Sequence, residues 1–255
     1  MISDYHKSKL FDLVYELGKR VELIKNRSFI SDFKNDKSPV TEADYLVNRE
    51  LIKFIKTTSI KNFISEEVSS TNYIERACWN LFWIIDPIDG TKEFITKGDD
   101  YTINIALCKK NIPIFSVVHA PARKELFYGE INKGAYKNDK RIKVSDPKKD
   151  KINIVASKSH INKETYRFIE AAKENYEVNL MQFGSSLKIC KVAEGIADIY
   201  PRFGPTMEWD VCAADLILSE AGGHVLDLKG KSFTYNKEDL LNPFFIATSH
   251  KIYCK

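Results

Sequence analysis

Two aspartates three positions apart carry the clearest chemical signal in this sequence. Asp86 and Asp89 lie in WIIDPIDGT (residues 83–91), where an apolar run enters a turn stiffened by Pro87. Carboxylates held about 4 Å apart repel one another by roughly 4 kcal/mol at an effective dielectric constant of about 20. A hard dication such as Mg²⁺ removes that repulsion and prefers carboxylate oxygens as ligands. The segment alone is compatible both with a magnesium site and with an ordinary Asp-Pro and Asp-Gly turn.

The two residues after Asp89 are suited to binding an anion. Gly90 permits backbone angles that other residues avoid, and Thr91 can cap a helix that begins there. The free amide groups at such a helix start bind phosphate readily. This spacing would place a phosphate beside the two aspartates.

Further acidic residues follow or begin apolar stretches elsewhere in the chain. Glu66 and Glu67 come directly after the apolar residues 63–64, and Asp210 lies in the first turn of an apolar helix, where the helix dipole favours an anion. Asp44 lies one helical turn after Thr41, which can cap a helix. Each has a structural explanation, as loop charge, helix cap or solvated helix face. Their joint occurrence beside apolar sequence favours one shared site.

The elements that would position these acids alternate between helices and strands. Apolar residues at helical spacing predict helices over 10–21 and 42–54. Apolar runs predict strands over 101–108 and 114–119 and a hairpin of 126–128 with 134–136. A further buried strand is expected over 81–85, and we expect Pro87 to end it at Asp86 because proline has no amide donor.

A polar, turn-rich stretch over 145–150 is the expected boundary between two lobes. Beyond it we expect a strand over 152–156 and helices over 163–175, 185–194 and 210–221, the last ended by a glycine pair. The pattern predicts a layered α/β (α+β) sandwich. Its N-terminal lobe would be residues 1–146 and its C-terminal lobe residues 147–255, together forming one functional domain.

Composition excludes several classes of protein. The chain has 255 residues, of which 44% are hydrophobic and 29% charged, so it is globular rather than disordered. Its 39 basic and 35 acidic residues leave a charge of 39 − 35 = +4, too small to indicate nucleic-acid binding. It has no apolar run of membrane-spanning length and no secretory signal, so we expect a cytoplasmic protein and leave peripheral attachment to the inner membrane open.

The cysteines and histidines indicate neither a disulfide framework nor a zinc site. Five cysteines lie far apart without any CxxC pair, and the five histidines are equally scattered. Cys212 lies two residues after Asp210, yet we expect a buried helical side chain there rather than a nucleophile.

Four motifs together resemble the inositol monophosphatase superfamily of Mg²⁺-dependent, lithium-sensitive phosphatases. They are VTEAD (40–44), ISEE (64–67), WIIDPIDGTKEF (83–94) and EWDVCAAD…EAGG (208–223). A second set is similar to the CysQ type of that superfamily, the 3′(2′),5′-bisphosphate nucleotidases. This set comprises KEF (92–94), SKSH (157–160), GSSLK (184–188), YPRFGPT (200–206) and LLNP (240–243). The resemblance covers nearly the whole chain.

The resemblance implies a metal site in the cleft between the lobes of a layered sandwich. Glu66, Asp86 and the backbone carbonyl of Ile88 would hold a first Mg²⁺. Asp86, Asp89 and Asp210 would hold a second, and a third, weaker ion would contact Glu66, so two or three ions are expected per site. Mg²⁺ keeps several waters in its octahedral shell, so a few carboxylates per ion suffice.

The resemblance also implies catalytic and substrate-binding residues. Asp44 and Thr91 would orient and deprotonate the attacking water, with Glu66 as a further catalytic residue. Substrate contacts are expected from the following residues: Asp89, Gly90, Thr91, His160, Ser185, Lys188, Arg202 and Asp210. Without the resemblance, we favour a structural interpretation for three of these residues, as loop or solvated surface residues: His160, Lys188 and Arg202.

The implied reaction is hydrolysis of adenosine 3′,5′-bisphosphate to AMP and phosphate, a step that would clear a by-product of sulfate assimilation. The related 3′-phosphoadenylyl sulfate is a further candidate substrate. Two alternatives are an inositol- or sugar-phosphate phosphatase and a catalytically silent nucleotide or metal sensor. The expected partner is the small-molecule nucleotide, without nucleic acid or integral membrane contact, and the chain is expected to be a monomer or homodimer.

Overall fold

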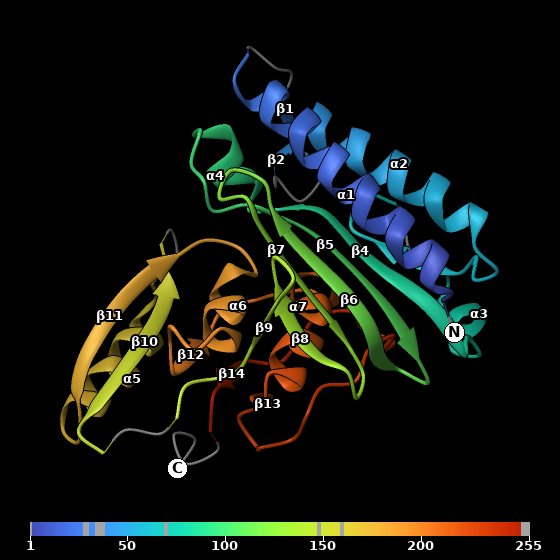
Figure 1. Ribbon diagram of the computed structural model, residues 1–255. Coiled ribbons are helices and arrows are strands. Elements are labelled where there is room, and N and C mark those ends of the chain that lie inside the picture. The colour runs from blue at the N-terminus through green and yellow to red at the C-terminus, as the bar shows by residue number, and fades with distance from the viewer. Residues whose placement is uncertain are drawn as a thin grey trace.

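The computed structural model describes residues 2–27, 31–33, 39–68, 71–146, 149–158 and 161–250 (Figure 1). Its larger sheet has these strands, in spatial order: β3 (Phe63–Ser65), β4 (Leu81–Asp89), β5 (Thr102–Lys109), β6 (Ile112–Ala120), β7 (Glu125–Glu130), β8 (Gly134–Lys137) and β9 (Lys140–Ile142). All neighbours pair antiparallel except β3 with β4, which are parallel.

A smaller sheet follows in the second half of the chain. Its strands, in spatial order, are β11 (Glu177–Phe183), β10 (Lys151–Ser157), β12 (Ile199–Arg202), β14 (Phe245–Thr248) and β13 (His224–Asp227). Two short strands, β1 (Ser31–Phe33) and β2 (Pro39–Thr41), pair with each other. The helices are α1 (Asp4–Lys25), α2 (Glu42–Thr57), α3 (Tyr73–Arg76), α4 (Thr91–Ile95), α5 (Lys163–Lys173), α6 (Leu187–Ala193) and α7 (Glu208–Glu220).

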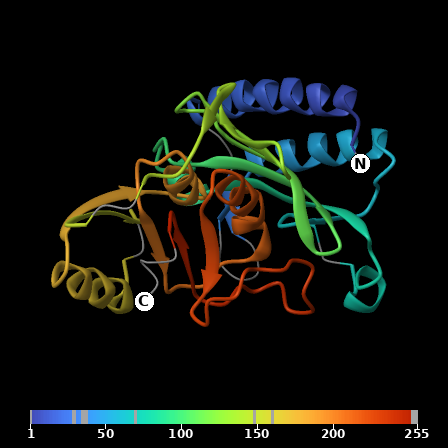
Figure 2. The ribbon, with the colours of Figure 1, turned by 60° about the horizontal axis from the view of Figure 1, so that its bottom comes forward.

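Helices and sheets alternate in five layers. The pair α1 and α2 covers the outer face of the larger sheet, α6 and α7 lie between the two sheets, and α5 covers the far face of the smaller sheet (Figures 1 and 2). These layers confirm the expected α/β sandwich. Since α7 packs on the larger sheet as well as on β13, residues after 147 contribute to the cores on both sides of the middle layer.

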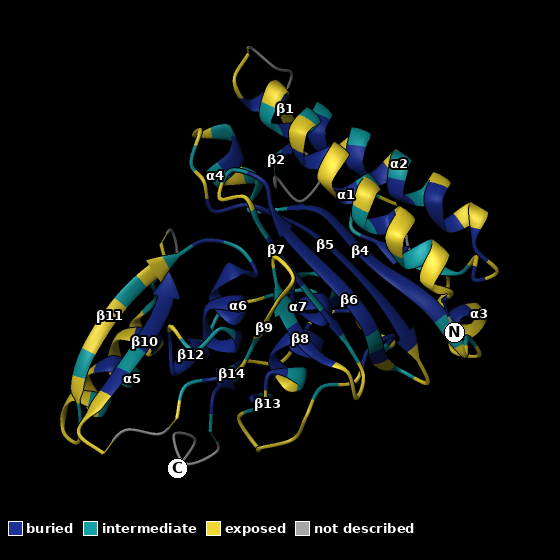
Figure 3. Cartoon of the chain, viewed as in Figure 1, coloured by how far each residue is buried: buried dark blue, intermediate teal, exposed yellow. Residues whose placement is uncertain are grey.

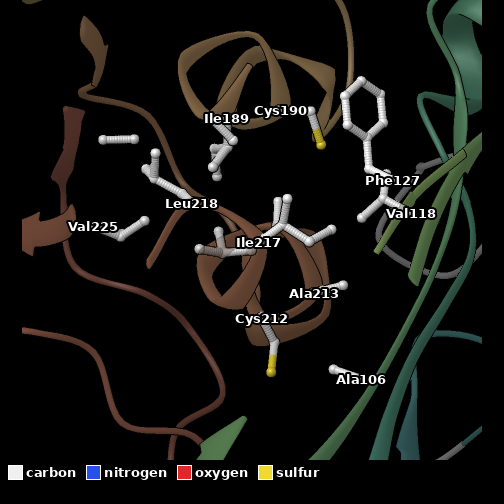
Figure 4. Close-up of a cluster of buried hydrophobic side chains, with 14 of the residues drawn as sticks. Ala106, Val118, Phe127, Ile189, Cys190, Cys212, Ala213, Ile217, Leu218 and Val225 are labelled. Carbon is white, nitrogen blue, oxygen red and sulfur yellow. The ribbon is translucent and has the colours of Figure 1, made fainter. Parts of the chain in front are cut away.

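Apolar side chains on both faces explain why the central strands are continuously hydrophobic. Along β4, Phe82 and Ile84 face the middle layer, whereas Trp83 and Ile85 face α1 and α2. Figure 3 shows the central strands of the larger sheet buried along their length, whereas the outer faces of the helices, the loops and the edge strand β11 are exposed. Figure 4 shows the middle layer, where Ile217 of α7 lies among side chains from α6, β13 and the larger sheet.

Local signals predicted most of these elements. Thr41 caps α2, its side chain accepting a hydrogen bond from the backbone N–H of Ala43 at 3.2 Å. The predicted hairpin is present as β7 and β8. Gly222, just beyond α7, has a φ of +100°, as expected of a residue that ends a helix. Among the described residues, no helix combines the length and the hydrophobicity needed to cross a membrane.

Several predicted boundaries were wrong, including the start of α7, which is Glu208 instead of residue 210, and two of the differences have a clear structural cause. Strand β4 does not stop at Asp86 but continues to Asp89, because the chain bulges there: Asp86 pairs with Asn104 and Asp89 with Thr102, so two residues of β4 oppose one of β5. The missing amide of Pro87 falls in this bulge, where no ladder bond is required. Helix α6 begins at Leu187 instead of residue 185, because Ser185 has a left-handed conformation with a φ of 48°.

Candidate metal centre and active site

Three carboxylates from three separate elements converge at one point. Glu66, Asp86 and Asp210 each offer an oxygen, and these atoms all lie within 4.8 Å of one another. Glu66 follows β3, Asp86 belongs to β4 and Asp210 lies in the first turn of α7. The three predicted metal ligands are therefore brought together from positions up to 144 residues apart, since 210 − 66 = 144.

The pairing of the strands explains part of this convergence. Ser65 of β3 lies directly opposite Ile85 of β4 in the parallel ladder. Because parallel strands run in the same direction, the next residues, Glu66 and Asp86, lie side by side, where β3 ends and the bulge of β4 begins. Asp210 reaches them because the N-terminus of α7 lies there, and its Oδ2 accepts a hydrogen bond from the Met207 N–H at 2.8 Å.

The electrostatics of the cluster favour a cation. Asp86 is fully buried, and neither of its carboxylate oxygens receives a hydrogen bond from the residues that the structure describes. Burial, reinforced by the charges of Glu66, Asp89 and Asp210, raises the pKa of Asp86 well above its usual range. Burial and the charge of Asp89 likewise raise the pKa of Asp210. A buried carboxylate among other acids needs either a proton or a positive ion, and oxygen ligands of this type suit Mg²⁺.

Asp89 lies beside this cluster, at the end of the β4 bulge. Its Oδ2 accepts a hydrogen bond from the backbone N–H of Ser186 at 2.5 Å. Burial raises the pKa of Asp89 to about 6, against the lowering effects of Lys188 and the Ser186 amide. Its charge contributes to the raised pKa of both Asp86 and Asp210, so the four acids form one electrostatic unit.

Asp44 and Thr91 meet at the base of the site. The Thr91 hydroxyl lies 3.5 Å from Oδ1 of Asp44 and donates to the Ile88 carbonyl at 3.0 Å. The other carboxylate oxygen of Asp44 accepts bonds from the Thr41 N–H at 2.7 Å and the Thr41 hydroxyl at 2.6 Å. Burial raises the pKa of Asp44 to about 7, although the bonds from Thr41 oppose the shift. This carboxylate is held rigidly, with Oδ1 directed towards Thr91.

Gly90 makes the tight turn from β4 into α4. Its φ is +91°, a region that favours glycine, and a Cβ there would approach the carbonyl oxygen of Asp100 to 2.9 Å. The turn places Thr91 at the start of α4, so the residues on both sides of Gly90 face the same site.

Two cationic side chains accompany the acids. Lys188 of α6 is buried, donates to the Ser185 carbonyl at 2.6 Å, and has a pKa lowered by burial to about 8. Arg202 ends β12, donates to the Pro205 carbonyl at 2.9 Å, and its buried Nε has no hydrogen-bond partner among the described residues. Both therefore retain donors that a phosphate could use.

Most of these acidic and basic groups line one cavity of about 860 Å³. The predicted site residues that line it are Glu66, Asp89, Gly90, Thr91, Ser185, Lys188, Arg202 and Asp210. Asp44 and Asp86 are buried, and neither is among the residues that line the cavity, nor is Ile88. His160 lies outside the described residues. Cys212 is buried within the middle layer, where burial raises the pKa of its thiol, as expected of a residue that is not a nucleophile.

Some residues of the site carried no predicted role. Ser186 lies in the GSSLK motif and in an expected helix but had no predicted role of its own, yet its backbone N–H donates to Asp89. Asn162 and Thr206 line the cavity, and the Asn162 side chain donates to the Phe203 carbonyl at 2.6 Å. The GSSLK motif and the Gly184-Ser185 pair indicate a turn before Ser186, but neither shows what the turn contacts.

Comparison with known proteins agrees with this geometry. The sequence profile of the inositol monophosphatase family matches residues 8–251. The 3′(2′),5′-bisphosphate nucleotidase CysQ of Salmonella typhimurium is 38% identical over 220 residues, which cover 84% of this chain and 87% of that protein. The crystal structure of CysQ from Bacteroides thetaiotaomicron is also 38% identical and matches with a TM-score of 0.83, covering 94% of this chain and 96% of that one.

A more distant structure shows the same fold. An IMPase/NADP phosphatase complexed with Mg²⁺ and phosphate is 19% identical and matches with a TM-score of 0.81, covering 98% of this chain and 93% of that one. The resemblance predicted from the motifs is therefore confirmed, including its CysQ type. The chain belongs to the inositol monophosphatase family.

Proposed function

We propose that this protein is a Mg²⁺-dependent phosphomonoesterase that hydrolyses adenosine 3′,5′-bisphosphate to AMP and phosphate. The observation that carries the proposal is the convergence of Glu66, the buried Asp86 and Asp210 beside a cavity that is also lined by Lys188 and Arg202. The first group suits metal ions and the second suits a substrate with more than one phosphate. The relatives named 3′(2′),5′-bisphosphate nucleotidase support the same substrate class.

Glu66, Asp86, Asp89, Asp210 and the Ile88 carbonyl would hold two or three magnesium ions. The hydrogen bond from Thr91 occupies one lone pair of the Ile88 carbonyl, so the second is available to an ion. Bound magnesium makes a water molecule acidic enough to attack at neutral pH and neutralises charge on the phosphoryl group and the leaving oxygen.

Asp44 and Thr91 would act on the attacking water. Because Thr41 holds Oδ2 of Asp44, Oδ1 is the oxygen that accepts the proton of the water, and the Thr91 hydroxyl, 3.5 Å from Oδ1, would accept a hydrogen bond from that water and orient it. A carboxylate with a pKa of about 7 is a stronger base than an exposed aspartate, which suits proton transfer near neutral pH. Glu66, as part of the acidic cluster, would be a further catalytic residue.

Lys188 and Arg202 would bind the second phosphate of the nucleotide. Lys188 acts as a point charge, whereas the guanidinium of Arg202 can bind two phosphate oxygens at once. Ser185, with His160, would add neutral and titratable donors, and the remaining contacts, from Asp89, Gly90 and Asp210, would orient the ester that is cleaved. We also propose 3′-phosphoadenylyl sulfate as a second substrate and sulfur assimilation as the pathway served. A monomer or homodimer is proposed for the assembly.

The test is phosphate release, with and without Mg²⁺, from adenosine 3′,5′-bisphosphate, inositol 1-phosphate and fructose 1,6-bisphosphate. We expect the nucleotide to have the highest kcat/KM, and EDTA to abolish release from it. Preference for either other ester would overturn the substrate assignment. Binding of Mg²⁺ and nucleotide without turnover of any ester would instead indicate a sensor.

A further inference from the structure

A closed ring of hydrogen bonds lies buried beside Asp89. The Ser186 hydroxyl donates to Oδ1 of Asn104 at 2.8 Å, and Nδ2 of Asn104 donates to the Thr102 hydroxyl at 3.2 Å. The Thr102 and Ser186 hydroxyl oxygens, 2.8 Å apart, close the ring. Because the hydrogen of Ser186 goes to Asn104, Thr102 must donate to Ser186, so each hydroxyl donates once and accepts once. The three residues are only 0%, 1% and 3% exposed for Thr102, Asn104 and Ser186.

The ring sits directly against the bulge that carries the metal ligands. Thr102 and Asn104 belong to β5, where Thr102 pairs with Asp89 and Asn104 pairs with Asp86. Ser186 comes from the start of α6, in the middle layer. The ring therefore joins the start of α6 to the part of the larger sheet at which β4 changes register.

This junction sets the position of one amide group. The hydroxyl of Ser186 is held by two partners on β5, so its backbone N–H is held as well, and that N–H donates to Oδ2 of Asp89 at 2.5 Å. The orientation of the Asp89 carboxylate thus depends on where the start of α6 is placed.

A second anchor holds the same loop two residues earlier. The Gly184 N–H donates to Oδ2 of Asp100 at 3.2 Å, and the guanidinium of Arg123 donates to the other oxygen of that carboxylate at 2.8 and 2.5 Å. A Cβ on Gly184 would approach the Asp100 carbonyl oxygen to 2.6 Å, so the two chains are in close contact. With both ends of Gly184–Ser186 attached to residues 100–104, the loop has little freedom to move away from Asp89.

We propose that Thr102, Asn104 and Ser186 are positioning residues, which orient the Asp89 carboxylate for the metal and substrate through the Ser186 amide. The inference rests on the proposed function, because it needs Asp89 to act at the metal site. Burying three polar side chains costs free energy, because each group loses its hydrogen bonds to water and must replace them with hydrogen bonds inside the protein. Apolar side chains could fill the same space between β5 and α6, but they would form no hydrogen bonds that fix the direction of the Ser186 amide.

The test compares variants that break the ring with variants that preserve it. Ser186→Ala and Thr102→Val each remove one hydroxyl, whereas Thr102→Ser keeps it. Ser116→Ala is the matched control, because the Ser116 hydroxyl is fully buried in the same sheet and donates to the Ala213 carbonyl at 2.8 Å. Each protein is examined by titration calorimetry with MgCl₂, by thermal unfolding, and by kcat and KM for adenosine 3′,5′-bisphosphate.

We expect Ser186→Ala and Thr102→Val to bind Mg²⁺ about 3- to 10-fold more weakly and to lose about tenfold in kcat, a factor that corresponds to about 1.4 kcal/mol. Thr102→Ser keeps the hydroxyl and with it both hydrogen bonds of residue 102 in the ring, so this variant should stay within about twofold of the wild type in Mg²⁺ affinity and kcat. Ser116→Ala should lose stability while keeping Mg²⁺ affinity and kcat.

Three results would overturn the inference. The first is that Ser186→Ala and Ser116→Ala have the same Mg²⁺ affinity and the same kcat. The second is that Thr102→Val and Thr102→Ser lose Mg²⁺ affinity and kcat to the same extent. If Ser186→Ala does not fold, the comparison of Thr102→Val with Thr102→Ser tests the inference by itself. The third is a wild type without Mg²⁺ binding, which would overturn the metal site as well. If the wild type binds Mg²⁺ but does not hydrolyse adenosine 3′,5′-bisphosphate, only the proposed substrate is wrong. The calorimetric comparison of Mg²⁺ affinity among the variants then still tests the role of the ring.

Discussion

The hydroxyl of Thr91 lies 3.5 Å from a carboxylate oxygen of Asp44, although the two residues are 47 positions apart in the chain. The contact joins the first turn of α2 to the first turn of α4. Both helix starts are built by local capping chemistry, at Thr41 for α2 and by the left-handed Gly90 for α4. Two helix termini, each formed by its own capping residue, thus place a carboxylate and a hydroxyl side by side near the cluster of acids.

We predict that Asp44→Asn lowers kcat by at least about 100-fold, the usual contribution of a general base. The amide oxygen can still accept the hydrogen bonds from Thr41, so the helix cap should survive and the melting temperature should not fall. Steady-state kinetics and Mg²⁺ titration of the purified variant check this. An activity within tenfold of the wild type would show that the proton goes elsewhere.

We predict that Asp86→Asn stabilises the protein in EDTA and abolishes its activity. Burial and the neighbouring carboxylates raise the pKa of Asp86, so removal of its charge relieves a cost that the metal-free protein bears. The melting temperature in EDTA should rise by a few degrees, roughly the effect of 1 kcal/mol in a chain of this size. Mg²⁺ should raise the melting temperature of the wild type more than that of the variant.

A melting temperature of Asp86→Asn that falls in EDTA would contradict this view of the cluster. The control is Asp198→Asn, because Asp198 is an equally buried acid whose oxygens are satisfied by Ser145 and by the Asn153 N–H. Loss of that charge should destabilise the protein with or without Mg²⁺.

We predict that Lys188→Met raises KM for adenosine 3′,5′-bisphosphate about 10- to 100-fold, in line with the loss of a charged hydrogen bond of about 1.5–3 kcal/mol. Methionine keeps most of the apolar stem that packs in α6, so the fold should be retained. Hydrolysis of a substrate with a single phosphate, such as inositol 1-phosphate, should change much less. Equal losses on both substrates would show that Lys188 acts through its bond to the Ser185 carbonyl.

We predict that Asp215→Asn removes a pH dependence of stability that lies outside the active site. Asp215 of α7 is buried against Tyr235, whose hydroxyl donates to it at 2.6 Å, and burial raises its pKa to about 7. The folded state therefore binds the proton more tightly than the unfolded state, whose aspartates titrate near pH 4. The contribution of Asp215 to the free energy of unfolding is therefore largest below about pH 4 and decreases as the pH rises to about 7. The decrease between pH 5 and pH 7 is roughly 2 kcal/mol.

Chemical unfolding of the wild type and Asp215→Asn at pH 5, 6, 7 and 8 measures this effect. The variant should lose less stability between pH 5 and pH 7 than the wild type does. The same slope in both proteins would mean that the carboxyl group of Asp215 titrates normally.

Much of this fold was predictable because it depends on local chemistry. The Thr41 cap, the apolar face of α1, the buried run of β4 and the glycines after α7 all act within a few residues. The acids themselves were recognisable by type, since Asp86, Glu66 and Asp210 each adjoin apolar sequence. These signals identified the chemistry and, with the family resemblance, the class of protein.

Only the tertiary structure decided how these residues meet. Strand β4 passes through Pro87 because its partner β5 admits a bulge, and sequence alone does not show which strand is the partner. For the same reason, the contact of Ser186 with Asp89 and the ring with Thr102 and Asn104 were not foreseeable. Strand register and helix packing depend on how whole faces fit together, and that free energy is spread over many distant contacts instead of residing in any short motif.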